Sequence, residues 1–122
     1  MIVDDNEFPF TDLMVNHTKL IETRPTRAFK SHELIDRMGI IRKLNGQYHL
    51  VATCVLGRPR KYTKDAEFDA DYNFHKVNRG SKFYIKDGGI KWGYPLLDLR
   101  PTERTQVYPK GCSSVRYIDI EL

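Results

Sequence analysis

The 122-residue sequence lacks the features of several protein classes. It has only 2 cysteines, Cys54 and Cys112, whose spacing suits no metal site, so we expect two reduced thiols rather than a disulfide. Its longest apolar run is far too short to span a bilayer, which argues against a membrane protein. Residues 1–18 contain no lysine or arginine, so we expect neither a signal peptide nor a transit peptide there. These absences predict a cytoplasmic protein.

The sequence also lacks the common catalytic and cofactor-binding motifs. It contains no G-x-S-x-G motif, no P-loop and no dinucleotide fingerprint. Its 4 histidines have no metal-ligand spacing among themselves or with the cysteines, so we expect each to be an ordinary surface or core residue. We therefore predict no metal site and no cofactor.

The composition is that of a globular domain, but its charges are segregated. A hydrophobic content of 40% and a charged content of 30% predict a single domain spanning residues 1–122 with its own core. The net charge is +4. Residues 40–64 contain lysine and arginine but no acidic residue, and a run of acidic residues follows at 65–71. This segregation indicates a basic patch for a polyanion, with a solvated charged face as the alternative.

Helix and strand signals are both present in the first half of the chain. After a frayed acidic start, residues 8–17 are a predicted helix, with Pro9 at its first position and Asn16 in the left-handed conformation that closes it. Residues 19–24 are a predicted strand, which the following proline stops. A second short helix is expected within residues 25–37.

The clearest local signal is Asn45-Gly46, the preferred dipeptide of a two-residue β-hairpin turn. The flanking apolar runs, 38–43 and 47–56, are the predicted strands. Both faces of the second strand are largely apolar, so we expect it at the centre of a closed or covered sheet.

The rest of the chain is assigned from alternation, capping and turn residues. In chain order we predict a basic loop at 57–64, a short helix at 65–74, a strand at 82–86, a hairpin turn at 87–89, a strand at 90–99, a loop at 100–111 and a strand at 115–122. Pro95 within the 90–99 strand indicates a sheet edge or a bulge. The elements together predict an α+β fold, a small mixed β-barrel of about six strands with two or three short helices.

Residues 19–24 contain the best candidate for a functional site. Lys19, Glu22 and Arg24 place an amine, a carboxylate and a guanidinium close together in the sequence. In a regular strand Glu22 and Arg24 leave the same face, whereas Lys19 joins them only if the strand begins just after it. A surface salt bridge on a half-buried strand is the alternative.

Residues 17–24 resemble the G-x-K-x-x-E-x-R signature of the ASCH family, a branch of the PUA-like β-barrels. Residues 92–99 and 108–111 are similar to the family's late strand and to its Pro-x-Gly segment before the final strand. The resemblance implies a PUA-like barrel and a cleft between barrel and first helix that faces RNA or a nucleotide. His17 departs from the pattern, because it stands where the family usually has glycine, and the change bears on backbone geometry.

Two functions fit these residues. The first is an RNA- or nucleotide-binding ASCH domain in RNA metabolism or regulation, with a basic cleft beside the Lys-x-x-Glu-x-Arg motif. In this hypothesis the cationic side chains meet phosphates, and Tyr62 in the basic loop stacks on a base in preference to Trp92, which a strand would place in the core. The predicted nucleic-acid-binding residues are Lys19, Arg24, Arg58, Arg60, Lys61 and Tyr62.

The second function is a small hydrolase that acts on a modified nucleoside or on RNA. One group of ASCH relatives hydrolyses the acetyl amide of N4-acetylcytidine, but that group has threonine where this chain has Glu22. In this hypothesis Lys19 is the base, Glu22 shares the proton transfer and Arg24 stabilises the oxyanion. Burial beside Arg24 would lower the pKa of Lys19, whereas an ion pair with Glu22 would raise it.

Overall fold

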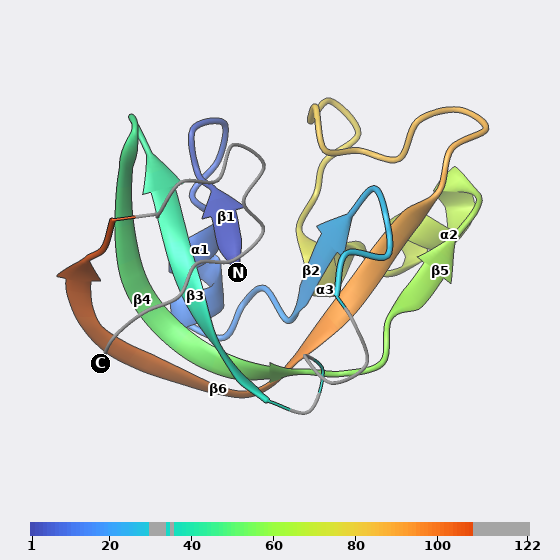
Figure 1. Cartoon of the computed structure of the whole chain (residues 1–122). Coiled ribbons are helices and arrows are strands. Elements are labelled where there is room, and N and C mark those ends of the chain that lie inside the picture. Colours follow the sequence, from blue (N-terminus) through green and yellow to red (C-terminus); the bar gives the residue numbers. More distant parts are fainter. Residues whose placement is uncertain (30–33, 35, 109–122) are drawn as a thin grey trace.

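The computed structural model describes residues 1–29, 34 and 36–108. Six strands in this part of the chain form one sheet in the order β1-β3-β4-β6-β2, and β5 pairs with β6 beside this path (Figure 1). The elements in chain order are β1 (Ile2–Asp4), α1 (Phe10–Val15), β2 (Ile21–Arg24), β3 (Arg37–Leu44), β4 (Gln47–Leu56), β5 (Arg60–Tyr62), α2 (Asp65–Ala70), α3 (Tyr72–His75) and β6 (Lys91–Gln106).

The sheet is curled into a half-barrel. Its longest strand, β6, runs along the whole curve and pairs with β4 over one half and with β2 and β5 over the other (Figure 1). The pairing of β4 with β6 shifts register twice, between Leu50 and Ala52 and between Thr53 and Val55. Such irregularities bend a strand and increase its twist, which brings the two edge strands, β1 and β2, toward each other. The predicted mixed barrel of six strands is therefore confirmed in this half-closed form.

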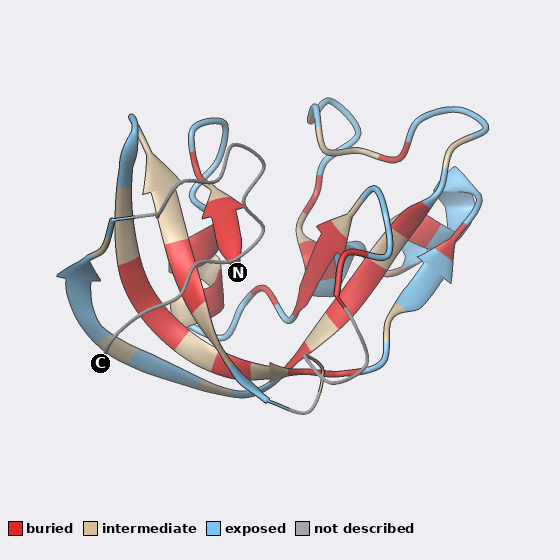
Figure 2. Ribbon diagram, in the orientation of Figure 1, coloured by how far each residue is buried: buried red, intermediate tan, exposed pale blue. Residues whose placement is uncertain are grey.

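The hydrophobic core fills the concave side of the sheet. Buried residues concentrate in the middle of β4 and in the first half of β6, whereas the second half of β6 is largely exposed (Figure 2). Helix α1 contacts β1, β4 and β6, while α3 contacts β2. Met14 of α1, Ile40 of β3 and Tyr94 of β6 are fully buried where these elements meet. The helices thus complete the core that the half-barrel leaves uncovered.

Several predicted elements are confirmed. The hairpin around Asn45 and Gly46 has the predicted turn, with φ angles of 51° and 76°, and its arms are β3 and β4. Strand β4 is central, as its two apolar faces indicate, because it pairs with β3 on one side and β6 on the other. The predicted first helix is α1, although it begins at Phe10 with Pro9 as its N-cap.

The start of the chain is a strand, so the prediction of a frayed acidic start is wrong. Ile2 and Val3 pair in parallel with Ile41 and Arg42 of β3. The side chains of Ile2 and Val3 are buried. A parallel pair joins residues that are far apart in the sequence, and a three-residue strand is too short to show alternation.

The predicted end of the strand at 90–99 is also wrong. Residues 100–106, expected as a loop, continue β6, and Pro101 pairs with Ala52 of β4. Here β6 pairs with β4 on one side only among the described strands, so a proline without an N–H is tolerated on the free side. The predicted irregularity near Pro95 lies slightly later, where Asp98 has a φ of 46° beside the register shift.

Three further assignments differ from the structure. Residues 82–86 form turns rather than a strand, residues 60–62 of the predicted basic loop form β5, and the helix expected at 65–74 is divided into α2 and α3. The divided helix exposes Tyr72 and Phe74, while Phe68 is fully buried. The strand predicted at 115–122 and most of the helix predicted within 25–37 lie outside the described residues. No helix among the described residues is long and apolar enough to span a membrane.

Candidate functional site

The site begins at a tight turn between α1 and β2. The backbone N–H groups of Thr18 and Lys19 both donate to the carbonyl of Leu13, at 2.7 and 2.9 Å, and close the helix. His17 has the left-handed φ of 63° that the sequence assigned to Asn16, whose φ is −91°. The position where the ASCH signature has glycine is thus the one that requires a positive φ. Strand β2 then begins at Ile21, after Lys19. The alternation of side chains between the two faces of a strand therefore does not apply to Lys19, which can point to the same side as Glu22 and Arg24.

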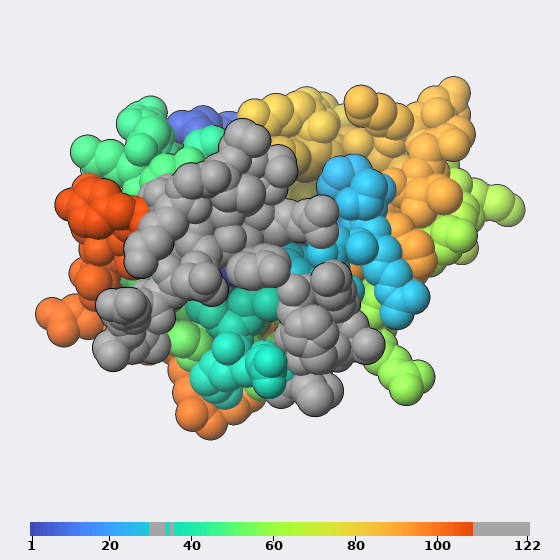
Figure 3. Space-filling view, in the orientation of Figure 1, coloured from blue at the N-terminus to red at the C-terminus, as the bar shows by residue number. Residues whose placement is uncertain are grey.

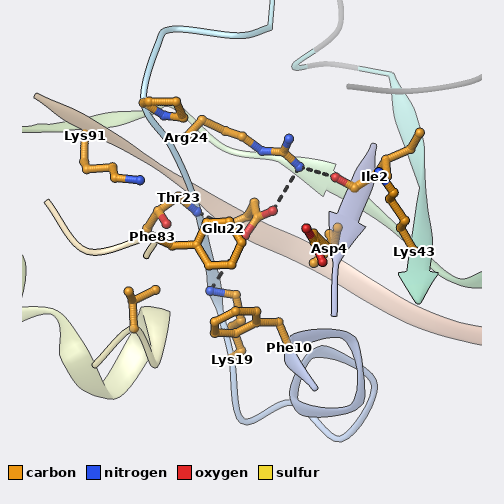
Figure 4. Close-up of a pocket in the computed structure, with 13 residues that line it drawn as sticks. Ile2, Asp4, Phe10, Lys19, Glu22, Thr23, Arg24, Lys43, Phe83 and Lys91 are labelled. Carbon is orange, nitrogen blue, oxygen red and sulfur yellow. Dashed lines mark hydrogen bonds and ion pairs between the residues drawn. The ribbon is translucent and has the colours of Figure 1, made fainter. Parts of the chain in front are cut away.

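Lys19, Glu22 and Arg24 form one hydrogen-bonded and ion-paired group. Lys19 Nζ lies 3.7 Å from Glu22 Oε1, and Arg24 Nη2 donates to Glu22 Oε2 at 2.9 Å (Figure 4). The same Nη2 donates to the carbonyl of Ile2 in β1 at 2.7 Å. Because β1 and β2 are the two edges of the sheet, Arg24 connects them across the opening of the half-barrel.

Lys19 is the most buried charged group of the site. Its side chain is 1% exposed, its ammonium lies 4.9 Å from the centre of the Phe10 ring, and it donates to the carbonyl of His75. Burial lowers the pKa of Lys19 to about 8, and Arg24 adds to this effect while Glu22 opposes it. The two opposing influences expected from the sequence are both present, and the lowering prevails.

A cleft of about 240 Å³ lies between β1 and β2, with this group at its base (Figure 4). Ile2, Val3, Asp4, Phe10, Lys19, Glu22, Thr23, Arg24, Pro25, Lys43, Val77, Phe83 and Lys91 line it. The lining includes four cationic side chains but only two carboxylates. It is therefore an electropositive cleft with aromatic walls, which suits an anionic ligand that has a flat apolar part.

No protein-family model matches the sequence, and no curated protein is similar to it. Among solved structures, the crystal structure of a mutant of ZmASCH from Zymomonas mobilis is similar to this one, with a TM-score of 0.68 at 12% sequence identity. The match covers 85% of this chain and 71% of that chain. This chain has the ASCH fold. The predicted resemblance to the ASCH proteins is confirmed at the level of the fold, and the Lys-x-x-Glu-x-Arg motif lies at the helix-to-strand junction where it was expected.

The basic segment at 40–64 does not form one patch in this ASCH fold. Lys43 lines the cleft, Arg42 contacts Asp5, and Arg60 pairs with Asp71 at 2.9 Å. Arg58 is exposed and lies outside the cleft lining. Segregation along the sequence is lost because Arg42 and Lys43 lie in β3 and Arg60 and Lys61 lie in β5, which occupy different parts of the sheet.

Lys61 and Trp92 form a second basic surface, on the strands beside the cleft. Trp92 of β6 is the register partner of both Arg24 in β2 and Lys61 in β5. Its ring lies 5.7 Å from Lys61 Nζ and 5.7 Å from the Arg27 guanidinium carbon. In the space-filling view, the residues after β2 (light blue) lie beside the start of β6 (orange) (Figure 3). Since neighbouring strands are about 5 Å apart, the Cα atoms of Lys61 and Arg24 lie about 10 Å apart, with β6 between them.

The structure does not favour Tyr62 as the stacking residue. Tyr62 lies in β5 rather than in a loop, and its ring is 3% exposed. It packs edge-on against Phe68, and its hydroxyl donates to Asp71 at 2.6 Å. Trp92 is partly exposed and is flanked by two cations, so the ASCH fold makes it the better candidate of the two.

Lys91 and Phe83 line the cleft, but no pattern in the sequence predicted this. Lys91 comes from the start of β6 and Phe83 from a turn segment, both far from the motif in the sequence. Among the described histidines, His75 is buried: its Nδ1 accepts from the N–H of Val77 and its Nε2 contacts the carbonyl of Phe68 at 2.6 Å, so it is a neutral core residue. Among the described residues, no cluster of His, Cys, Asp and Glu could hold a metal ion.

Proposed function

We propose that this chain binds RNA or a nucleotide in the cleft between β1 and β2. The observation that supports the proposal best is the charge of the lining, where Lys19, Arg24, Lys43 and Lys91 outnumber Asp4 and Glu22. A cleft with low-dielectric walls and an excess of one charge concentrates ligands of the opposite charge.

The size and walls of the cleft favour a single nucleotide unit. A volume of about 240 Å³ is just below the roughly 300–1,000 Å³ of typical small-molecule sites. Phe10 and Phe83 provide apolar ring surface in the lining, on which a base packs favourably. In an RNA strand, one unpaired nucleotide would enter the cleft, and the neighbouring phosphates would meet the surface around Lys61 and Trp92.

The salt dependence of binding tests this proposal. Affinity for a short fluorescent single-stranded RNA should fall linearly on a log–log plot of association constant against salt, by about 0.7 per phosphate contacted. Lys43→Met, in the cleft, should reduce the affinity and the slope. Neutralising Arg58, Arg60 and Lys61 together should also flatten the slope if the surface around Lys61 and Trp92 guides the RNA strand. An RNA affinity that does not change with salt would contradict the proposal.

A hydrolase that acts on an acylated nucleoside such as N4-acetylcytidine, or on RNA, is the second candidate. The specific observation that favours it is Lys19, whose buried amine has its pKa lowered to about 8. An appreciable neutral fraction at pH 7–8 allows the amine to take a proton from an attacking water and return it to the leaving group. Glu22 lies close enough to share this proton, while Arg24 is committed to Glu22 and Ile2.

Incubation of the purified protein with N4-acetylcytidine tests the second candidate. Release of cytidine and acetate should be abolished in Lys19→Met, which keeps most of the side-chain volume in the buried site. The exposed lysine variant Lys86→Met is the matched control and should retain turnover. Turnover that persists in Lys19→Met would exclude Lys19 as the base.

A further inference from the structure

Lys91 is a buried cation without a hydrogen-bond or ion-pair partner among the described residues. The residue is 7% exposed and lines the cleft. It makes no hydrogen bond and no ion pair with any of the described residues. Figure 4 shows its side chain entering the cleft from β6, with the ammonium directed toward Thr23. Burial lowers the pKa of this amine, the charges of Arg24 and Lys86 add to the lowering, and Glu22 opposes it only in part.

The carboxylates of the cleft are already occupied by other groups. Glu22 Oε2 accepts from Arg24, and Oε1 accepts from the N–H of Thr23 at 3.2 Å and lies 3.7 Å from Lys19. Asp4 accepts two hydrogen bonds from Asn6, both 2.8 Å long, and pairs with Lys82 on the outside. Neither carboxylate of the lining therefore forms an ion pair with Lys91, and Glu22 acts on it only from a distance.

Arg24 adds a second unsatisfied donor on the same side. Its Nη2 makes both of the hydrogen bonds described above, but its Nε is buried without a hydrogen-bond partner. Each such group costs about 1–3 kcal/mol of stability. Of the three unpaired buried side-chain atoms in the described residues, Arg24 Nε is the one that belongs to a residue of the cleft, since Arg42 Nε and Thr102 Oγ1 lie outside its lining. The unpaired donors of Lys91 and Arg24 together indicate that the cleft is incomplete without an anion.

We propose that the ligand of the cleft carries a phosphate ester and that Lys91 binds this phosphate at the β6 end of the cleft. The inference rests on the proposed function, since the phosphate is that of a nucleotide unit, either free as a monoester or within RNA as a diester. A neutral nucleoside would leave Lys91 unpaired. The phosphate supplies several strong acceptors to a site that has donors in excess.

A comparison of neutral and phosphorylated ligands by isothermal titration calorimetry tests the proposal. The panel contains the four ribonucleosides, their 5′- and 3′-monophosphates, the matching dinucleoside monophosphates and inorganic phosphate. For the wild type, at least one phosphorylated form of the preferred base should bind about tenfold or more tightly than its nucleoside. Preference for the monoester indicates a free nucleotide, and preference for the dinucleoside monophosphate indicates an RNA strand.

The Lys91→Met variant tests whether Lys91 binds the phosphate. In this variant the phosphorylated ligand and the nucleoside should bind within about twofold of each other, whereas Lys91→Arg should keep much of the preference. Lys86→Met removes an exposed charge from the same region and should leave the preference unchanged. Thermal unfolding should show that Lys91→Met is no less stable than the wild type, because the removed ammonium has no partner.

The results separate this inference from the function on which it rests. If nucleosides and their phosphates bind equally well, or if Lys91→Met keeps the preference, the inference is wrong and the nucleotide-binding function stands. If a large loss of stability accompanies Lys91→Met, Lys91 has a structural role and the inference is wrong. If none of the ligands, nor RNA, binds at all, both proposals are overturned.

Discussion

Two charged clusters of the structure, one around Asp5 and one around Glu22, differ in how well their charges are balanced. Asp5 accepts hydrogen bonds from the backbone N–H and the hydroxyl of Thr11 and lies 3.6 Å from Arg42 Nε. The second cluster places Lys19 and Arg24 around Glu22 and leaves Lys91 without a counterion among the described residues.

This difference in charge balance is the basis for proposing that the Asp5 cluster is structural and the Glu22 cluster binds a ligand. At Asp5, one carboxylate accepts two hydrogen bonds from Thr11 at the start of α1 and faces one arginine, so the charges of the cluster cancel, although Arg42 Nε makes no hydrogen bond with the described residues. At Glu22, one carboxylate faces more cations than it can neutralise, and the cluster borders a cleft. Burial of charge alone is therefore weak support for a site, and the proposal rests on the excess of one charge beside a cavity.

The largest expected effect is on the balanced cluster. Asp5→Ala leaves Arg42 and the N–H of Thr11 without their partner, so we expect the free energy of unfolding to fall by about 3 kcal/mol. Urea denaturation measures this change. Asp12→Ala, an exposed acidic residue of α1, is the matched control, with an expected change below about 0.5 kcal/mol. A loss below about 1 kcal/mol for Asp5→Ala would mean that the cluster does not stabilise the fold.

The second prediction concerns the pH dependence of stability. The pKa of Lys19 is about 8 in the folded protein and near 10.5 when unfolded, so between these values the unfolded state binds more protons. The contribution of Lys19 to stability should therefore rise with pH from about 8 to 10.5, by on the order of 3 kcal/mol. Lys19→Met should lack this rise when unfolding free energies are compared at several pH values. The same rise in both proteins would show that Lys19 titrates normally.

A smaller effect is expected when the central carboxylate is neutralised. Glu22→Gln removes the charge that offsets Lys19 and Arg24, so we expect a loss of about 2 kcal/mol in unfolding free energy and several-fold tighter binding of a nucleotide phosphate at low salt. Calorimetric titration and urea denaturation measure the two effects. Glu103→Gln, which is exposed on β6, controls for the change in net charge. Weaker nucleotide binding by Glu22→Gln would mean that Glu22 contacts the ligand directly.

The smallest effect is expected at the turn that aims Lys19 into the cleft. His17 has a φ of 63°, which glycine adopts without strain. His17→Gly should stabilise the fold by up to about 1 kcal/mol and leave nucleotide binding unchanged. Thermal unfolding checks the first expectation and calorimetry the second. A destabilised variant would show that the turn tolerates histidine without strain.

The parts that the sequence predicted correctly are those specified by local residues. The turn at Asn45 and Gly46, the helix that contains Met14 and the strand that contains Glu22 each follow from a short pattern. The parallel pairing of Ile2 depends on a strand far along the chain, and no local pattern shows it. Strand β6 continues through Pro101 because its other side is free there, which is known only once the sheet order is known.

The same distinction applies to the site. Lys19, Glu22 and Arg24 are close in sequence and were predicted together, although the burial of Lys19 depends on Phe10 and on the backbone of α3. Lys91 enters the cleft through strand pairing, so its role could not be predicted. Tyr62 was expected to be exposed because its segment is polar, yet β5 turns its ring into the core against Phe68.

Chemical-shift mapping tests most directly whether the unbalanced cluster is the binding site. Amide resonances of the ¹⁵N-labelled protein should shift on addition of a ribonucleoside monophosphate or a short RNA, with the largest changes in β1, in β2 and at the start of β6. The Lys91 side chain should shift with the same apparent affinity. Changes confined to the surface around Arg58 and Arg60, or to the balanced cluster at Asp5, would contradict a binding site in the cleft.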